Sequence, residues 1–385
     1  MTSVRRGVRL LGLPAAAIIV LSVGASAVRT QSATPVTFAD LFHEYLRGDA
    51  DRAVQILATW PARQIERDVK LPPGENDPWF KAALALLLSQ VYVGLPETPL
   101  HRQDVSTVHM EKAITSTLHM EKAITLMGEA HGAARASSDR QLLAFCRDWY
   151  IVGLFFNLGF GTDFESETRR RFPDDPLAQL ELGKRAEWWM EIVPDGGTDG
   201  WVKGSGRPSD IVGTSSHGPY GEEAAKAERA FRRALALDPT VVEARVRLGR
   251  VLWFLDRREE AERELTEAQR EATGANAAPM AYLAALFLGQ LYEETGRLDA
   301  AREVYEKALS VYPTGQAARL ALGRLLVATG READGWTTTA LALEPPAWDR
   351  HPPDPWTFYS QASIRGTSGW SPAARFNDLR SRVRR

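Results

Sequence analysis

The sequence predicts an all-α protein in which pairs of helices stack along one elongated core. Leu-Gly pairs recur through the second half of the chain: Leu182-Gly183, Leu248-Gly249, Leu288-Gly289 and Leu322-Gly323. The last two pairs are 34 residues apart, a period typical of stacked helical repeats. Sustained polar-apolar alternation and hairpin dipeptides, which indicate strands, are sparse throughout.

Composition excludes several classes of protein. The 385 residues are 44% hydrophobic and 25% charged, with a formal net charge of −2. Such a chain is too apolar to be disordered, and its net charge provides no field to hold nucleic acid or an anionic membrane. Cys146 is the only cysteine, so an internal disulfide and a multi-cysteine metal site are both excluded.

Residues 1–27 have the pattern of a secretory signal peptide. Three arginines, Arg5, Arg6 and Arg9, precede an apolar run that ends in Gly24-Ala25-Ser26-Ala27, and we expect cleavage after Ala27. The alternative is an uncleaved membrane anchor, but the run is about 18 residues, shorter than the ~20 of a spanning helix, and is broken by Pro14. Cleavage would leave a soluble chain of charge 44 − 49 = −5.

The region 36–175 is expected to be helical but diverged from the later repeats. The stretch 45–53 resembles the centre of a helix-turn-helix unit, because Gly48 and Ala53 have the same spacing as Gly296 and Ala301 further along. Apolar helices are predicted at about 78–93 and 140–158. We therefore expect this region to continue the stack of helices.

A ten-residue segment is duplicated at 106–115 and 116–125, with only Val108 and Leu118 differing. On a helix, ten residues leave the two copies about 80° apart around the axis. Metal binding by the histidines and glutamates at 109, 111, 119 and 121 is therefore disfavoured, since ligands need a shared face. A recent duplication with one dispensable copy is the simplest interpretation.

The clearest repeat unit extends from Tyr282 to Pro313. Its diagnostic residues, with their equivalents in the preceding unit, are expected to pack the helix pairs: Leu248, Gly249, Ala261, Leu288, Gly289, Tyr292, Gly296, Ala301, Tyr305, Ala308 and Pro313. In this pattern the unit resembles the tetratricopeptide repeat (TPR) family. The resemblance implies a right-handed α-solenoid in which small residues allow close helix crossing and Pro313 ends the second helix.

The repeat region is expected to cover 176–344. The unit at 242–269, which precedes the clearest unit, lacks the turn glycine and has Asp256 in its place. The pattern decays after Gly330, as in a terminal capping repeat. The first unit is split by a Gly-rich insertion at 193–220, which we interpret as a surface loop. A phosphate-binding loop is disfavoured there, because no strand precedes it and no Gly-Lys-Ser/Thr follows it.

No catalytic, metal-binding or cofactor-binding pattern is found in the sequence. A nucleophile elbow, a phosphate loop, a His-Glu-x-x-His pair and a zinc-spaced cysteine set are all missing. Cys146 lies in an aromatic segment and is expected to be a buried, inert thiol. Asp174 and Asp175 precede Pro176 and indicate a helix start.

The resemblance implies a binding groove lined by the first helix of each repeat. Carried over by position, its candidate residues are Lys184, Glu187, Trp188, Arg250, Trp253, Gln290 and Arg324. Cations beside indole rings could hold an extended acidic segment. The alternative is that the cations are solvated and the tryptophans pack between helices. The asparagine and lysines with which the family grips a C-terminal carboxylate are not found.

The segment 345–385 differs from the repeats. Aromatic residues follow prolines within 352–359, which suggests an extended strap packed on the last repeat and hiding its exposed face. The arginines from Arg375 to Arg385 are expected to form a short amphipathic helix with a frayed end. Five cations beside Asp378 are few for nucleic-acid binding.

These observations favour an exported solenoid scaffold, periplasmic or secreted, that binds a protein or peptide and has no catalysis or cofactor of its own. The first alternative is a structural component of a cell-envelope complex, which a large exposed apolar patch would favour. A less favoured alternative is an enzyme using the first helical region, which would need a polar pocket around 109–160.

Overall fold

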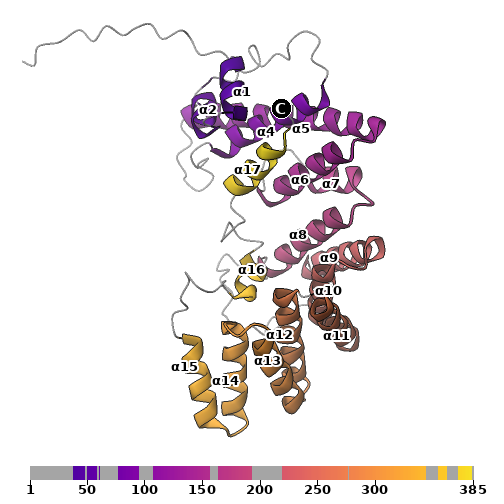
Figure 1. Cartoon of the computed structure of the whole chain (residues 1–385), viewed down its shortest axis with the longest axis vertical. Coiled ribbons are helices and arrows are strands. Elements are labelled where there is room, and N and C mark those ends of the chain that lie inside the picture. The colour runs from indigo at the N-terminus through magenta and orange to yellow at the C-terminus, as the bar shows by residue number, and fades with distance from the viewer. Residues whose placement is uncertain are drawn as a thin grey trace, which may run out of the picture.

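The computed structural model describes residues 38–47, 50–58, 60, 77–94, 107–156, 164–192, 219–275, 277–343, 354–361 and 372–383. All regular elements in these segments are helices, and successive pairs stack as the right-handed α-solenoid that the sequence predicts. Figure 1 shows the stack extending from the indigo helices to the orange ones. The predicted signal peptide at 1–27 and almost all of the Gly-rich insertion lie outside the described residues.

The described helices of the first part of the stack are α1 (Phe38–Arg47), α2 (Ala50–Ala58), α4 (Pro78–Gly94), α5 (Thr107–Ser137), α6 (Arg140–Phe156) and α7 (Phe164–Arg171). Helix α4 is central, with every side chain from Ala82 to Val91 buried. The two polar side chains within this buried stretch, Ser89 and Gln90, both accept hydrogen bonds. The Trp149 indole donates to Ser89 at 3.0 Å, and the Tyr45 hydroxyl donates to Gln90 at 2.7 Å. A helix apolar on all sides is stable only when neighbours cover it, and α2, α5 and α6 do so here.

Helix α5 contains the duplicated segment. Its described side chains begin at Met120, which is buried together with Ala123 and Met127. The second copy therefore contributes to the core, and either copy supplies nearly the same residues.

Deletion of residues 106–115 is expected to leave the melting temperature within a few degrees of the wild type, because the retained copy keeps the core contacts of α5. Deletion of 126–135, of equal length, removes the buried Leu126, Met127, Ala130 and Ala134 and should prevent folding. Thermal unfolding followed by circular dichroism compares the two. Loss of the transition in the first deletion would contradict the interpretation.

Eight helices form four pairs in the repeat region: α8 (Pro176–Ile192) with α9 (Pro219–Leu237), α10 (Val242–Phe254) with α11 (Arg258–Gly274), α12 (Ala278–Glu294) with α13 (Leu298–Val311), and α14 (Gln316–Ala328) with α15 (Glu332–Leu343). Each pair contacts the next. Helix α13 ends at Val311, just before Pro313.

The Leu-Gly glycines allow a large side chain of the partner helix to approach the backbone. A Cβ at Gly289 would lie 2.2 Å from the Tyr305 ring, and one at Gly249 would lie 2.6 Å from Leu265. Gly183 faces the Phe231 ring in the same way, at 2.4 Å. In these three pairs the bulk therefore comes from the second helix, and glycine on the first helix makes room for it.

Most residues of the repeat pattern are buried in the structure. Those buried between the helices are Leu248, Gly249, Ala261, Leu288, Gly289, Ala301, Tyr305 and Ala308. Tyr292 is half-buried and donates through its hydroxyl to Glu262 at 3.1 Å. Gly296, in the turn between the two helices, has a φ of +72°.

Asp256 occupies the turn position where later repeats have glycine, and its φ is +59°, compared with +72° at Gly296 and +81° at Gly330. A residue with a Cβ is strained in this left-handed region, although aspartate tolerates it better than most. Asp256→Gly should therefore raise the free energy of unfolding by about 0.5–1 kcal/mol, even though it removes the exposed ion pair with Arg258. Urea denaturation measures this, and a decrease in stability would contradict it.

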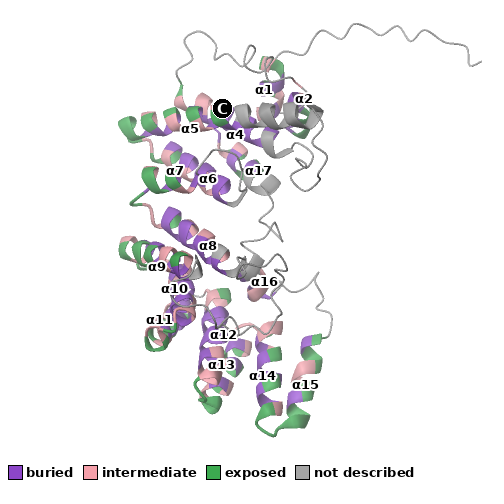
Figure 2. Ribbon diagram, turned by 180° about the vertical axis from the view of Figure 1, so that it is seen from behind, coloured by how far each residue is buried: buried purple, intermediate pink, exposed green. Residues whose placement is uncertain are grey.

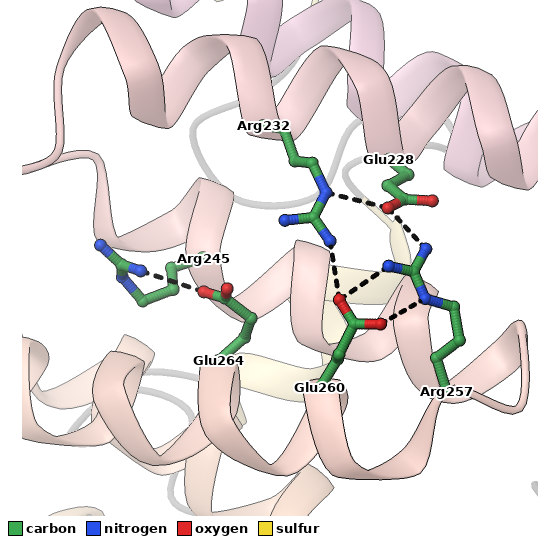
Figure 3. A network of polar contacts seen from close by, with 6 residues as sticks. All are labelled: Glu228, Arg232, Arg245, Arg257, Glu260 and Glu264. Carbon is green, nitrogen blue, oxygen red and sulfur yellow. Dashed lines mark hydrogen bonds and ion pairs between the residues drawn. The ribbon is translucent and has the colours of Figure 1, made fainter.

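Ion pairs connect helices within and between the first two repeats, as Figure 3 shows for six residues: Glu228, Arg232, Arg245, Arg257, Glu260 and Glu264. Arg257 donates to both carboxylate oxygens of Glu260 and to Glu228, each at 2.7 Å. Arg232 also contacts both carboxylates, at 2.9 and 3.2 Å. Because the four groups form a closed ring, they fix α9 against α11 more firmly than isolated surface pairs would.

The segment after the repeats contains two helices, α16 (Pro355–Gln361) and α17 (Pro372–Arg382). The described part of the strap contacts the last repeat through Asp354, which accepts from the Ala317 amide of α14, but α16 does not lie over the exposed face of α15 as we expected. Helix α16 instead lies against α12 and reaches α8 (Figure 1). On α15, Trp336 and Leu343 remain 64% and 72% exposed (Figure 2). The aromatic side chains of α16 pack instead against the Phe287 ring of α12 and against the paired charges of Glu187 on α8 and Arg247 on α10.

Helix α17 is the amphipathic helix predicted from the arginine run, and its apolar side chains complete the core of the first region. Phe376, Leu379 and Val383 are buried there. Arg382 donates to Asp148 of α6 at 2.6 Å, and Arg380 donates to the Tyr45 carbonyl at 3.3 Å. Among the described helices, none combines the length and apolarity that a membrane crossing requires.

Candidate functional site

The candidate site is the surface on which α16 lies, which we call the docking face. It is made by Glu187 of α8, Arg247 and Arg250 of α10, and Phe287 of α12. Two of these, Glu187 and Arg250, are residues that the resemblance placed in a binding groove. The helical stack thus brings together side chains from three successive repeats.

Glu187 is the centre of the docking face and is almost fully buried. Its carboxylate accepts hydrogen bonds from Arg247 at 2.7 Å, from Arg250 at 3.0 Å and from the Tyr359 hydroxyl of α16. Burial raises the pKa of Tyr359 well above its usual value of 10, so the hydroxyl keeps its proton and donates it to the carboxylate. A buried carboxylate needs such donors to offset its lost hydration.

The charges of this region neutralise one another. Arg247 also pairs with Glu243 at 2.9 Å, and Lys184 lies between Glu181 at 2.9 Å and Glu243 at 3.6 Å. With Glu187 and Arg250, the network holds three cations and three carboxylates. Burial would raise the pKa of Glu243, but Lys184 and Arg247 outweigh it and hold that pKa at about 2.

The depressed pKa of Glu243 predicts a loss of stability in acid. Its contribution should be complete above the usual glutamate pKa near 4.5 and should disappear as the pH falls toward 2. Glu243→Gln should therefore be less stable than the wild type at pH 7, with the difference shrinking as the pH falls through this window. Urea denaturation at pH 7, 4 and 3 tests this, and a constant difference would contradict it.

Aromatic rings cover the charged centre. Tyr359 and Trp356 of α16 stack with centroids 5.8 Å apart, and both contact the edge or face of Phe287, at 5.1 and 5.9 Å. The Arg247 guanidinium lies 4.1 Å from the Tyr359 ring centroid, and that of Arg250 lies 5.2 Å from it. Desolvated guanidinium-aromatic contacts of this kind are worth about 2 kcal/mol or more.

Asp354 fixes the start of α16. One carboxylate oxygen accepts from the Trp356 amide at 2.7 Å, and so begins α16. The other accepts from the Ala317 amide of α14 at 2.7 Å and from the Tyr282 hydroxyl at 2.9 Å. One buried side chain therefore attaches α16 to the third and fourth repeats.

The other residues predicted for the groove are not among the four that make the docking face. Trp253 is buried and its indole donates to Glu294 at 2.7 Å, and Arg324 forms an ion pair with Glu293. Trp188 and Gln290 are half-buried on α8 and α12. Of the seven predicted residues, Glu187 and Arg250 thus belong to the docking face, and Lys184 joins its charge network through Glu243.

The sequence did not predict that Arg247 and Phe287 belong to the site, or that Asp354 contacts α12 and α14. A signal existed for Arg247, because it precedes Arg250 by three residues and therefore shares its helix face. No comparable signal distinguished Phe287 from the other apolar residues of its helix.

A pocket of about 370 Å³ lies between α5 and α7, in the region where an enzymatic site would have to be. Its lining is basic: His131, Gly132, Arg135, Arg170 and Arg171. Burial and the three arginines lower the pKa of His131 to about 4, so it is neutral at pH 7. This lining contains no carboxylate to form an acid-base pair with the histidine.

Cys146 is buried, and burial raises the pKa of its thiol to about 12. The thiol is therefore protonated at neutral pH and is no nucleophile. Across the segments that the structure describes, no group of His, Cys, Asp and Glu side chains is arranged to hold a metal ion.

Comparison with known proteins agrees with the repeat pattern. Residues 246–315 and 289–347 match the family model described as tetratricopeptide repeat. No curated protein matches the chain.

Several solved structures are similar. MamA from Desulfovibrio magneticus RS-1, residue 41 to its end, is 19% identical, with 56% of this chain and 93% of that one covered and a TM-score of 0.34. The C-terminal part of a TPR repeat-containing protein from Cytophaga hutchinsonii is 13% identical, with 74% and 99% covered and a TM-score of 0.36. A chain of the APC/C hetero-tetramer Cut9-Hcn1 is 13% identical, with 89% and 62% covered and a TM-score of 0.34.

Proposed function

We propose that this chain, whose later repeats match the tetratricopeptide repeat model, is an exported scaffold that binds a protein or peptide. The binding surface is formed by the first helices of the four repeats, α8, α10, α12 and α14, which we call the inner helices. The observation that carries the proposal is the occupation of the docking face by a peptide segment, α16. A surface that already binds a short helix through paired charges and aromatic rings has the chemistry of a peptide-recognition site.

An acidic partner would need cations that are open to it. Lys184 and Arg250 are paired with buried or half-buried glutamates at the docking face. Arg324 is the most exposed of the predicted groove cations, although it pairs with Glu293. The proposal for an acidic partner therefore rests mainly on Arg324, which lies on α14 at the far end of the predicted groove.

Quantitative affinity capture tests the binding role. The mature chain, starting at Val28, is immobilised and exposed to an envelope extract, and captured proteins are measured by mass spectrometry. Arg324→Glu should reduce recovery of a specific partner at least tenfold, because it reverses a charge on the proposed groove.

Arg302→Glu is the matched control, since Arg302 lies on the second helix of its repeat and forms only exposed pairs. Recovery should be unchanged by this variant. If Arg324→Glu and Arg302→Glu retain the partner equally, the inner helices are not the binding surface in the region of α14.

Export is the second part of the proposal and rests on the pattern of residues 1–27. Fusion of residues 1–35 to alkaline phosphatase, which is active only where its disulfides form, should give active enzyme outside the cytoplasm. Replacing Ala25 and Ala27 with leucine should leave the fusion uncleaved. An inactive wild-type fusion would contradict export.

A role in assembling an envelope complex is the second candidate, and the last repeat favours it. Trp336, Ala340 and Leu343 share one exposed face of α15. Apolar side chains gathered on a surface often mark an interface. Trp336→Ser with Leu343→Ser should abolish any self-association or complex seen by light scattering, while leaving capture at the inner helices intact.

A further inference from the structure

We infer that α16 is a built-in ligand of the docking face, and that the partner binds there with a short helix of the same chemistry: an acidic cap, a tryptophan or similar ring two residues later, and a tyrosine three residues after that. This inference deepens the proposed function and rests on it. The partner must displace α16 from the docking face before it can bind there.

The contacts of α16 are those of a ligand. The described contacts of the segment come from Asp354, Trp356 and Tyr359. Spacings of two and five residues from the cap put both rings on one side of a helical turn. The third and fourth repeats supply the partners of Asp354, and the first three repeats supply those of the rings, so the segment follows the solenoid as a bound peptide would.

The docking face keeps its charge balance when α16 is absent. Glu187 retains both arginines, and Arg247 retains Glu243. Departure of α16 would leave the Tyr282 hydroxyl and the Ala317 amide without the Asp354 carboxylate. Around Glu187 it would expose the Phe287 ring, now fully buried, and one carboxylate oxygen that has lost its hydroxyl donor. An aromatic ring that has a hydroxyl group satisfies both needs, whereas an acidic side chain at this point would meet the Glu187 carboxylate.

Release of α16 also requires little of the fold to open. The helix has seven residues, too few to persist as an isolated helix, and it does not pair with a solenoid helix as α8 to α15 do. Helix α17 is separately anchored by Phe376 and Leu379 in the first core. The segment can therefore detach locally while both its ends stay attached, as opening of low-stability elements commonly does.

The test uses a fluorescein-labelled peptide of residues 352–361 as the probe and the full mature chain as the receptor. The open variant, Trp356→Ala with Tyr359→Ala, should bind the peptide at least tenfold more tightly than the wild type, because its own segment no longer competes. Adding Arg250→Ala to the open variant should remove that gain. Arg302→Glu, in the exposed ion pairs of α13, is the control and should bind as the wild type does.

Tyr359→Phe provides a second variant that changes only one hydroxyl, in case the open variant fails to fold. It should raise the apparent peptide affinity several-fold, and the matching peptide with Tyr359→Phe should bind the open variant several-fold more weakly than the natural peptide. Circular dichroism and thermal unfolding establish that each variant is folded.

Three results would overturn the inference. A folded open variant that does not bind the peptide would make α16 a fixed part of the structure. A wild-type dimer that exchanges α16 between copies would make a second copy the occupant. Greater capture of an envelope partner by the open variant, without competition from the peptide, would reject the ligand class while leaving the binding function standing. Loss of partner capture in every variant would instead count against the proposed function.

Discussion

Replacement of Glu187 by alanine is expected to lower the free energy of unfolding by about 3–5 kcal/mol, the usual result of breaking a buried ion pair on one side. The carboxylate accepts from Arg247, Arg250 and Tyr359. Its removal leaves the nearly buried Arg247 with Glu243 alone and leaves the Tyr359 hydroxyl buried without its acceptor. Guanidine denaturation at pH 7 measures the change.

The control for this variant is Glu306→Ala, which removes a carboxylate from an exposed pair with Arg302. Surface pairs contribute at most about 1 kcal/mol, so the loss should be small. A loss below about 1 kcal/mol for Glu187→Ala would mean that water or rearrangement replaces the carboxylate, and that the docking face is less rigid than its contacts indicate.

Gly289→Ala is expected to destabilise the protein by about 1–3 kcal/mol, the cost of overpacking a close-packed interior. The new Cβ would lie 2.2 Å from the Tyr305 ring. The ring is fully buried, and its hydroxyl is held by Glu293 at 3.0 Å, so it cannot simply turn away. Helices α12 and α13 must therefore separate, which disturbs the repeats on both sides.

Gly132→Ala, in the interior of α5, is the matched control because no atom lies within 4 Å of the added Cβ. There the same change should stabilise the helix by about 0.5–1 kcal/mol, since glycine is the poorer helix former. Thermal unfolding of both variants gives opposite signs if packing decides the outcome. Equal effects would show that helix propensity alone is responsible.

The repeat architecture could be predicted because its signal is local. Gly289 and Tyr305 are 16 residues apart in the sequence, within one helix pair, and the 34-residue period repeats their relation. The first region was predicted to be helical and to continue the stack, but not which helices pack on α4, because α4 is apolar on every side and periodicity does not say which helices cover it.

The docking face could be predicted only in part. Glu187 and Arg250 are recognisable from their positions in the repeat. Their ligand was not, since Tyr359 is separated from Glu187 by 172 residues. Nothing in a Pro-rich segment distinguishes a strap over the last repeat from one that returns to the first. That choice depends on the Phe287 ring and on the charges around Glu187, which are assembled only in the fold.

Helix α17 changes how this chain can fold. Repeat arrays are built from contacts between neighbours, so they form quickly and in any order. Arg380 contacts Tyr45 across 335 residues, and Arg382 contacts Asp148 across 234. The core of the first region therefore stays incomplete during synthesis until residues beyond 372 have been made. Helix α17 thus links the C-terminal end of the repeat region back to the first helical region, and the two regions should unfold together in one cooperative transition.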